Sequence, residues 1–272
     1  MKNITRILVI LLVFLTVGCV SIPSAIKLDE TADTKNIKVG VLLAEPKQAD
    51  TFFTGSIGLL DLAIIYGMNE SLREHLKTLE FKGFSKVGTG FTDILKEKGF
   101  VAELIEQPMP RAEANKLKLH ENGKSPNDLS SYADRYDRVL LLRIGSIGTT
   151  RDYYGPLPTS EPVATATLIG ELVDVKTKKV YWYQNLSATK VIPEPWDEQG
   201  YPNLTNSVYA ALNDSTEKLK AALTFNTSNE LEKDIKPGEK QTSGITKKTV
   251  DSSNEKDSTQ GAGKGVQKAS VL

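Results

Sequence analysis

The segment that ends at Cys19 places the tightest limits on what this chain can fold into. Lys2 and Arg6 are basic, Ile7–Val17 is almost entirely apolar, and Gly18 sets a small residue before Cys19. These features are typical of a secretory signal, and the apolar run is shorter than the ~20 residues that span a bilayer as a helix. Because Cys19 is the only cysteine, no internal disulfide can form. The folded part must therefore depend on a hydrophobic core.

The residues Leu15-Thr16-Val17-Gly18-Cys19 resemble the lipobox of bacterial lipoproteins, with Thr16 where leucine is more usual. The resemblance implies a signal peptide over residues 1–18 and a mature chain anchored to the membrane through lipid on Cys19. Several acyl chains would make this attachment durable, since one chain binds only marginally. Val20 after the cysteine resembles the outer-membrane sorting pattern, so the expected location in the cell envelope is the outer membrane, with the domain facing the periplasm. An ordinary signal peptide with a chance cysteine, or an uncleaved anchor, is the alternative.

Apolar residues are unevenly distributed along the rest of the chain. Residues 19–35 contain few large apolar side chains and are predicted to form a tether. The last aromatic residue is Phe225, and residues 227–272 are so polar that burial cannot offset the entropy of ordering them. We therefore expect an α/β domain over residues 36–226 and a disordered tail over 227–272. The charges balance, with 34 Lys and Arg against 34 Asp and Glu, so no nucleic-acid partner is expected.

The first half of this domain predicts one strand followed by helices. Ile37–Ala44 is apolar and β-branched and ends at a proline, which is typical of a buried strand. A loop is expected over residues 48–56. Ile57–Leu79 has helical periodicity, with a break at Gly67. The part before this break is apolar on nearly all sides, which favours a helix buried in the core. The alternative is a helix that contacts the membrane or a partner.

The second half predicts more helices and three consecutive strands. The expected elements are a helix over Thr92–Lys98 with Thr92 as N-cap, a strand over Phe100–Glu106, a short helix from Asn127 to Tyr136, a strand over Arg138–Ile147, a loop over Gly148–Pro162, a hairpin formed by Val163–Val175 and Val180–Leu186, and a final helix marked by Leu204, Val208, Leu212, Leu219 and Leu223. This order predicts a mixed sheet with a parallel start, a late antiparallel meander and flanking helices. Alternation along the last strand puts Trp182 on one face with Val180 and Gln184, and the hypothesis is that this face packs against the final helix.

Three stretches resemble a group of bacterial lipoprotein domains. They are Ile37–Ala44, Tyr136-Asp137-Arg138-Val139-Leu140-Leu141, and Glu171-Leu172-Val173-Asp174-Val175-Lys176-Thr177 leading to Val180-Tyr181-Trp182. The group includes the curli-secretion lipoprotein, the lipoprotein activators of penicillin-binding proteins, and small lipoproteins related to a neisserial surface antigen. The resemblance implies an α/β domain of the cell envelope and supplies no catalytic motif.

The chain lacks the usual signs of catalysis. His75 and His120 are the only histidines, and neither has partners at metal-ligand spacing, so we expect no metal, no cofactor and no enzyme activity. We expect instead a protein-binding or assembly role with other envelope proteins, with self-association left open. The alternatives are a subunit of an outer-membrane secretion or transport complex, and a periplasmic hydrolase of wall polymers. The candidate partner-binding residues are Tyr153, Tyr154, Tyr181, Tyr183 and Trp196, because exposed aromatic side chains favour interfaces.

Overall fold

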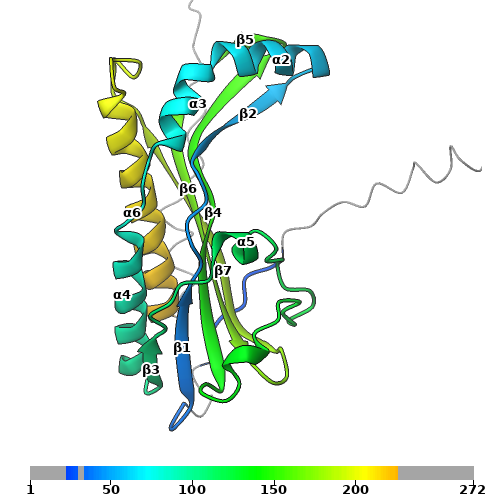
Figure 1. Ribbon diagram of the computed structural model, residues 1–272, viewed down its shortest axis with the longest axis vertical. Helices are drawn as coiled ribbons and strands as arrows, with labels where there is room; N and C mark the ends of the chain where they lie inside the picture. The colour runs from blue at the N-terminus through cyan, green and yellow to red at the C-terminus, as the bar shows by residue number, and fades with distance from the viewer. Residues whose placement is uncertain (1–22, 30–33, 226–272) are drawn as a thin grey trace, which may run out of the picture. The chain divides into compact units, whose positions relative to one another are not determined.

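The computed structural model describes residues 23–29 and 34–225 (Figure 1). The predicted signal peptide, the predicted tail and Cys19 lie outside these residues. In chain order the elements are β1 (Lys38–Leu43), β2 (Asp50–Ser56), α2 (Leu59–Met68), α3 (Glu70–Lys77), α4 (Phe84–Glu97), β3 (Val101–Leu104), α5 (Arg111–Ala114), the 3-10 helix η1 (Ser130–Tyr132), β4 (Arg138–Tyr154), β5 (Leu157–Pro158), β6 (Val163–Asp174), β7 (Val180–Val191) and α6 (Pro202–Thr224).

The strands form one mixed sheet in the order β3-β1-β4-β6-β7. β1 is parallel to β3 and β4, whereas β4, β6 and β7 are antiparallel neighbours. β2 is parallel to the later part of β4, from Gly148 to Tyr154, so β1 and β2 follow one another along the same edge of that strand. The predicted α/β class, with a parallel start, an antiparallel meander and flanking helices, is confirmed.

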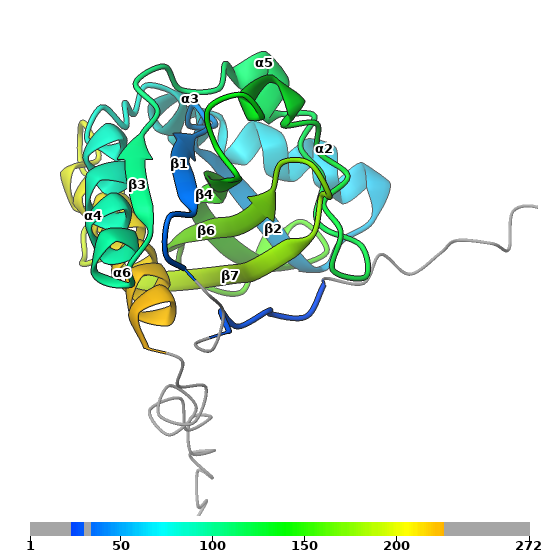
Figure 2. The same cartoon turned by 90° about the horizontal axis from the view of Figure 1, so that it is seen from below.

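Two hydrophobic clusters fill the two faces of the sheet. α4 and α6 lie side by side on one face (Figure 2), where Phe91 and Leu95 of α4 share a cluster with Val208 and Leu219 of α6. The other face is covered by α5 and by the irregular segments around it, through side chains such as Met109 and Leu129. The sheet is therefore buried on both faces over its lower part.

The final helix and the hairpin occupy the predicted places. All five residues expected on the inner face of α6 are buried, and Trp182 is fully buried in the same cluster. The alternation expected around Trp182 is wrong, however, because the β6–β7 register shifts there. Leu172 pairs with Trp182 and Val173 pairs with Val180, so Tyr181 is an extra residue. Such a β-bulge puts successive side chains on unexpected faces, and Val180 lies in the opposite cluster.

Two predicted loops are strands instead. Residues 48–56 contain β2, and residues 148–162 contain the end of β4 and the short strand β5. Close approach of β2 to β4 depends on Gly148, whose φ is +138°, and a Cβ there would lie 1.9 Å from the Asp50 carbonyl oxygen. Threonine and aromatic residues on both segments favour strands once they pair. The absence of a side chain at Gly148 therefore permits strand pairing.

Two expected helix starts are also wrong. α4 begins at Phe84, and Thr92 lies inside it with its hydroxyl donating to the Gly88 carbonyl at 2.9 Å. The Asn127 side chain caps no helix. Its amide oxygen accepts a hydrogen bond from the Lys118 N–H at 2.9 Å, and its amide nitrogen donates to the Lys118 carbonyl at 3.0 Å. Only the short η1 forms in the segment after it. In both cases a side chain able to cap a helix makes a different hydrogen bond.

Candidate protein-docking surface

Helix α2 exposes most of its apolar side chains. Leu59 and Leu60 are 91% and 84% exposed, Ile64 and Met68 are about half exposed at 51% and 54%, and Ile65 is the buried residue of this helix. The prediction of a core helix is therefore wrong. The alternative, a helix that presents apolar side chains to a membrane or a partner, agrees with the structure.

Exposed apolar side chains from three segments gather at this end of the sheet. Of the twelve large apolar side chains exposed within residues 23–29 and 34–225, eight belong to α2, β2 and the β4–β5 hairpin. Figure 1 shows these segments together at one end of β4. The eight, called the apolar tip below, are Phe52, Leu59, Leu60, Ile64, Tyr66, Met68, Tyr154 and Leu157. Single exposed apolar residues are ordinary, whereas a gathering of this kind marks an interaction site.

An aromatic cluster and a buried amide hold the apolar tip in place. Phe53 packs edge-on against Tyr66 at 5.3 Å and against Tyr153 at 5.5 Å between ring centroids. The buried Asn69 side chain donates to the Ile65 carbonyl and to the Tyr153 hydroxyl, both at 2.7 Å. These contacts join the end of α2 to β4, so the exposed side chains project from a fixed base.

An ion pair strengthens the same base on the α3 side. Arg73 donates to both carboxylate oxygens of Asp50, at 2.9 and 3.2 Å, and its guanidinium lies 4.4 Å from the ring centroid of Tyr66. Burial by itself would raise the pKa of Asp50, but hydrogen bonds from Arg73 and from the Thr51 amide outweigh it. The pKa of Asp50 is therefore below its usual value, and this carboxylate is charged at neutral pH.

Basic residues are absent from the segments that carry the apolar tip. The sequence contains no lysine or arginine from Asp50 to Met68 or from Tyr153 to Pro162. The acidic residue of α2, Asp61, accepts a hydrogen bond from the Gly58 amide at 2.9 Å. Surfaces that bind anionic lipid are rich in lysine and arginine. A composition of Leu, Ile, Met, Tyr and Phe is instead typical of the centre of protein interfaces.

The five aromatic residues predicted from the sequence do not share one surface. Tyr154 is 72% exposed and belongs to the apolar tip, whereas Tyr153 and Tyr183 are buried at 2% and 1%. Tyr181 and Trp196 are partly buried and pack against the cluster under α6. The prediction of a shared aromatic surface is corrected to Tyr154 alone, because Tyr153 supports the tip from below and the bulge at Tyr181 separates it from Tyr183.

Two of these aromatic rings are covered by arginine. The guanidinium of Arg138 lies 3.7 Å from the ring centroid of Tyr181, and that of Arg151 lies 5.2 Å from the centroid of Trp196. Arg151 also approaches Glu161 at 3.6 Å. Such cation–π contacts stabilise the fold locally, so both rings have structural partners.

Three polar side chains, those of His120, Arg143 and Glu171, are buried in the structure, and the sequence does not predict their burial. His120 is 5% exposed and packs edge-on against Tyr183 at 4.4 Å between ring centroids, and Glu171 is 2% exposed. Arg143 donates to the carbonyl oxygens of Leu117 and Lys118 at 3.0 and 3.2 Å. Burial raises the pKa of Glu171 despite Ser125, Arg143 and Asn127 nearby, and it lowers the pKa of Arg143.

Neither a metal centre nor a membrane span is found in the part of the chain that the structure describes. No group of three or more His, Cys, Asp and Glu residues there could hold a metal ion. No helix there is long and apolar enough to cross a bilayer. The acidic residues around Trp196, which are Glu194, Asp197 and Glu198, are exposed.

Neither a scan against protein-family models nor a search of curated proteins gives a match. Similar solved structures include a putative neuraminyllactose-binding hemagglutinin homolog from Helicobacter pylori, which is 12% identical over 79% of this chain and 96% of that one, with a TM-score of 0.33. PelC from Paraburkholderia phytofirmans, a dodecamer, is 9% identical over 74% and 96%, with a TM-score of 0.31. Lipoprotein GNA1162 from Neisseria meningitidis is 12% identical over 67% and 99%, with a TM-score of 0.23. Bacterial lipoproteins are thus among the similar structures, and at these scores the likeness carries no conclusion about function.

Proposed function

We propose that this chain is a lipid-anchored, non-enzymatic lipoprotein of the bacterial cell envelope that binds another envelope protein through its apolar tip. The observation that carries the proposal is the gathering of exposed apolar side chains on α2, β2 and the β4–β5 hairpin. Leaving Leu59 and Leu60 in water costs roughly 25 cal/mol for each Å² of apolar area. A binding partner would remove this cost, and the fixed base under the tip reduces the entropy lost on binding.

A protein partner is favoured over a bilayer by the charges near the tip. Asp50 is paired with Arg73, and the tip segments contain no lysine or arginine that could attract lipid phosphate. An envelope partner also agrees with the lipobox at Cys19, which would keep the domain close to the membrane. The outer membrane is the proposed location, because Val20 after Cys19 resembles the outer-membrane sorting pattern.

Site-specific crosslinking in intact cells tests the proposal. A photoreactive phenylalanine analogue at Leu60 should give one discrete crosslinked species on illumination, because this side chain belongs to the apolar tip and is 84% exposed. The same analogue at the exposed Glu97 of α4, outside the tip, should give none. Adding Ile64→Glu to the Leu60 variant should abolish the species, since it puts a charge into an apolar interface. Mass spectrometry would then identify the partner.

Lipid binding is measured separately with vesicles. Residues 19–272 with Cys19→Ser, which lack both the predicted signal peptide and the lipid, should stay in the soluble fraction when mixed with vesicles of phosphatidylethanolamine and phosphatidylglycerol. Flotation with these vesicles that is lost in Ile64→Glu would show that the tip binds membrane, and the protein-docking proposal would then be wrong. Equal crosslinking from Leu60 and Glu97 would contradict it as well.

The crosslinked product from Leu60 also tests the alternative that this chain is a subunit of a secretion or transport complex. A subunit of a secretion or transport complex would crosslink either to a channel protein or to a second copy of this chain, and the mass of the product separates the two. The hydrolase alternative has no support from the geometry of the described residues, where Glu194, Asp197 and Glu198 lie exposed on one loop. Paired carboxylates for glycoside cleavage need a fixed separation across a cleft.

A further inference from the structure

The segment before β1 packs onto the outer edge of β7. Ile26 and Tyr183 exchange both main-chain hydrogen bonds, each at 2.9 Å. Leu28 is buried, at 7% exposed, in the cluster shared by α4 and α6. Since β7 is the last strand in the order of the sheet, its main-chain groups at this point would otherwise be open to another chain. The chain that leads from Cys19 into the domain is therefore fixed to the sheet at Ile26.

This attachment limits how far the domain can lie from lipid on Cys19. Ile26 follows Cys19 by seven residues. Each residue covers at most ~3.6 Å even in a fully extended chain, so the reach is about 25 Å. A bilayer that holds lipid on Cys19 must therefore come within about 25 Å of the pair formed by Ile26 and Tyr183.

The apolar tip lies beyond this reach. Tyr183 pairs with Glu171, and Glu171 pairs with Leu141 of β4. From Leu141, β4 continues for thirteen residues to Tyr154, which is roughly 40 Å at the rise of a strand. Figure 1 shows the tip segments α2 and β5 at this far end of β4. A domain standing upright on its tip would need a longer tether, whereas a domain standing on its other end would not.

Two segments at that other end carry six exposed lysines. Residues 115–128 form an irregular loop, and residues 174–180 connect β6 to β7. Main-chain hydrogen bonds join these segments, as from the Ser125 amide to the Lys178 carbonyl at 2.8 Å. The lysines, called the lysine face below, are Lys116, Lys118, Lys124, Lys176, Lys178 and Lys179.

The lysine face has an excess of positive charge. The two segments contain these six lysines and three acidic residues, which are Glu121, Asp128 and Asp174. The Asp128 carboxylate accepts from the Ser130 amide at 3.1 Å, and the Asp174 carboxylate accepts from the Thr177 amide at 2.7 Å. None of the six lysines forms an ion pair within residues 23–29 and 34–225.

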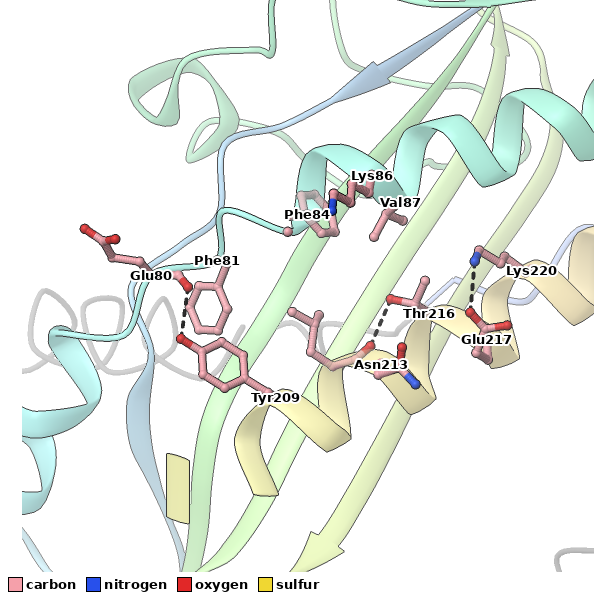
Figure 3. A pocket seen from close by; sticks show the side chains of 12 residues that line it. Glu80, Phe81, Phe84, Lys86, Val87, Tyr209, Asn213, Thr216, Glu217 and Lys220 are labelled. Atoms are coloured by element: carbon pink, nitrogen blue, oxygen red, sulfur yellow. Dashed lines mark hydrogen bonds and ion pairs between the residues drawn. The ribbon is translucent and has the colours of Figure 1, made fainter. Parts of the chain in front are cut away.

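The slot between α4 and α6, drawn in Figure 3, also contains lysines but has no such excess. Its charged residues are Glu80, Lys86, Glu217 and Lys220. The Lys220 ammonium pairs with the Glu217 carboxylate at 2.9 Å, and the charges of the slot balance. The lysine face differs in its position as well, because Lys179 precedes Tyr183 by four residues, or about 13 Å of extended chain.

We propose that the lysine face lies on the anionic phospholipid surface of the bilayer that holds Cys19, so that the apolar tip points away from that bilayer. This inference rests on the proposed lipid at Cys19. Lysines close to a membrane anchor are attracted to anionic headgroups. Three excess charges attract less strongly than one acyl chain, which itself binds only marginally. The lysine face therefore orients an anchored domain and does not retain an unlipidated one.

Acetylation of lysines on tethered protein tests this proposal. Residues 19–272, with Cys19 as the only thiol, are coupled to a maleimide lipid in vesicles of phosphatidylcholine with or without phosphatidylglycerol. Mass spectrometry follows the reaction of each lysine with an N-hydroxysuccinimide ester of acetate. Lys124, Lys178 and Lys179 should react at least about fivefold more slowly on the anionic vesicles, whereas Lys86 should react equally on both. Salt at ~1 M should remove the difference, because it screens charge beyond ~3 Å.

Charge reversal supplies the matched variants. Lys178→Glu combined with Lys179→Glu should restore fast acetylation of Lys124 on the anionic vesicles, whereas Lys86→Glu should not. All these side chains are exposed, so their replacement leaves the folded core intact. Equal rates at Lys124 on the two kinds of vesicle, or equal slowing at Lys86, would overturn the proposal.

Failure of this proposal is distinguishable from failure of the proposed function. The maleimide lipid replaces any lipid attached in cells, so the acetylation rates do not depend on cellular processing of Cys19. Crosslinking from Leu60 reports on the tip alone. Loss of the Leu60 product with slow acetylation of the lysine face would contradict the protein-docking role and leave the orientation supported. The reverse result would contradict only the lysine face.

Discussion

At the scale of single residues, the two faces of the sheet depend on adjacent side chains. Trp182 is fully buried under α6, and Tyr183 is buried on the opposite face against His120. We expect Trp182→Ala to lower the free energy of unfolding by ~3–5 kcal/mol, as other buried large-to-small changes do. Tyr183→Ala should cost a comparable amount, because both faces are covered. Urea denaturation of both variants checks this, and an effect at Tyr183 below ~1 kcal/mol would mean that its face opens to water.

Glu171 gives a second prediction at this scale, in the pH dependence of stability. Burial raises the pKa of Glu171 in the folded protein above that in the unfolded chain. The contribution of this side chain to the free energy of unfolding is therefore fully present below the unfolded-state pKa, and it is lost as the pH rises through the folded-state pKa. Glu171→Gln, which stays neutral, should therefore be more stable than the parent at pH 7. The difference should shrink as the pH falls to the ordinary value of 4.5. Urea denaturation across this pH range measures it, and a difference independent of pH would contradict the prediction.

At the scale of elements, the apolar tip exists because β2 pairs with β4. Gly148 has a left-handed φ of +138°, and a Cβ there would overlap the Asp50 carbonyl. Gly148→Ala should therefore separate the start of β2 from β4 and raise the rate of amide hydrogen exchange from Thr51 to Tyr66 by at least about tenfold. Exchange mass spectrometry on β2 and α2 checks this.

Gly67 is the matched glycine for that experiment. It lies within α2, and a Cβ there would meet nothing within 4 Å. Gly67→Ala should therefore leave exchange in β2 unchanged and stabilise α2 by up to about 1 kcal/mol. Faster exchange of β2 in both variants would show that the tip is sensitive to any change, and the role assigned to Gly148 would fail.

At the scale of the whole molecule, attachment to the membrane is predicted to depend on one thiol. Cys19→Ser should leave an unprocessed precursor that takes up no labelled palmitate, because the lipobox resemblance assigns the lipid to this cysteine. Labelling of whole cells with palmitate, followed by separation of the membranes on a sucrose gradient, tests both the lipid and the outer-membrane location. Equal labelling of the variant and the parent would exclude lipid on Cys19.

The residues after the domain give a second prediction at this scale. Deleting residues 227–272 should barely change the melting temperature, since their composition offers little apolar area to bury. Calorimetry of the full chain and the shortened chain measures this directly. A decrease of many degrees would show that these residues pack against the domain.

The sequence alone was sufficient to predict those helices and strands whose apolar residues recur with a single period. The 3.6-residue spacing from Leu204 to Leu223 predicted the buried face of α6, and period-two alternation predicted β6. Continuous apolar runs predicted β1 and the first half of β4. Each of these segments buries side chains that its own sequence marks as apolar, so hydrophobicity and period together determine the element.

Only the tertiary structure decided which apolar residues stay exposed, and with them the candidate site. Leu59 and Ile65 belong to the same apolar helix, yet Leu59 is exposed and Ile65 is buried, because β2 and Tyr153 cover only one side of α2. The strand character of residues 50–56 depends on Gly148, which is distant in sequence. Burial is a property of the neighbours that the fold brings to a residue, whereas periodicity records only the residue types along the chain. The helix could therefore be predicted from its own residues, and its exposed face could not.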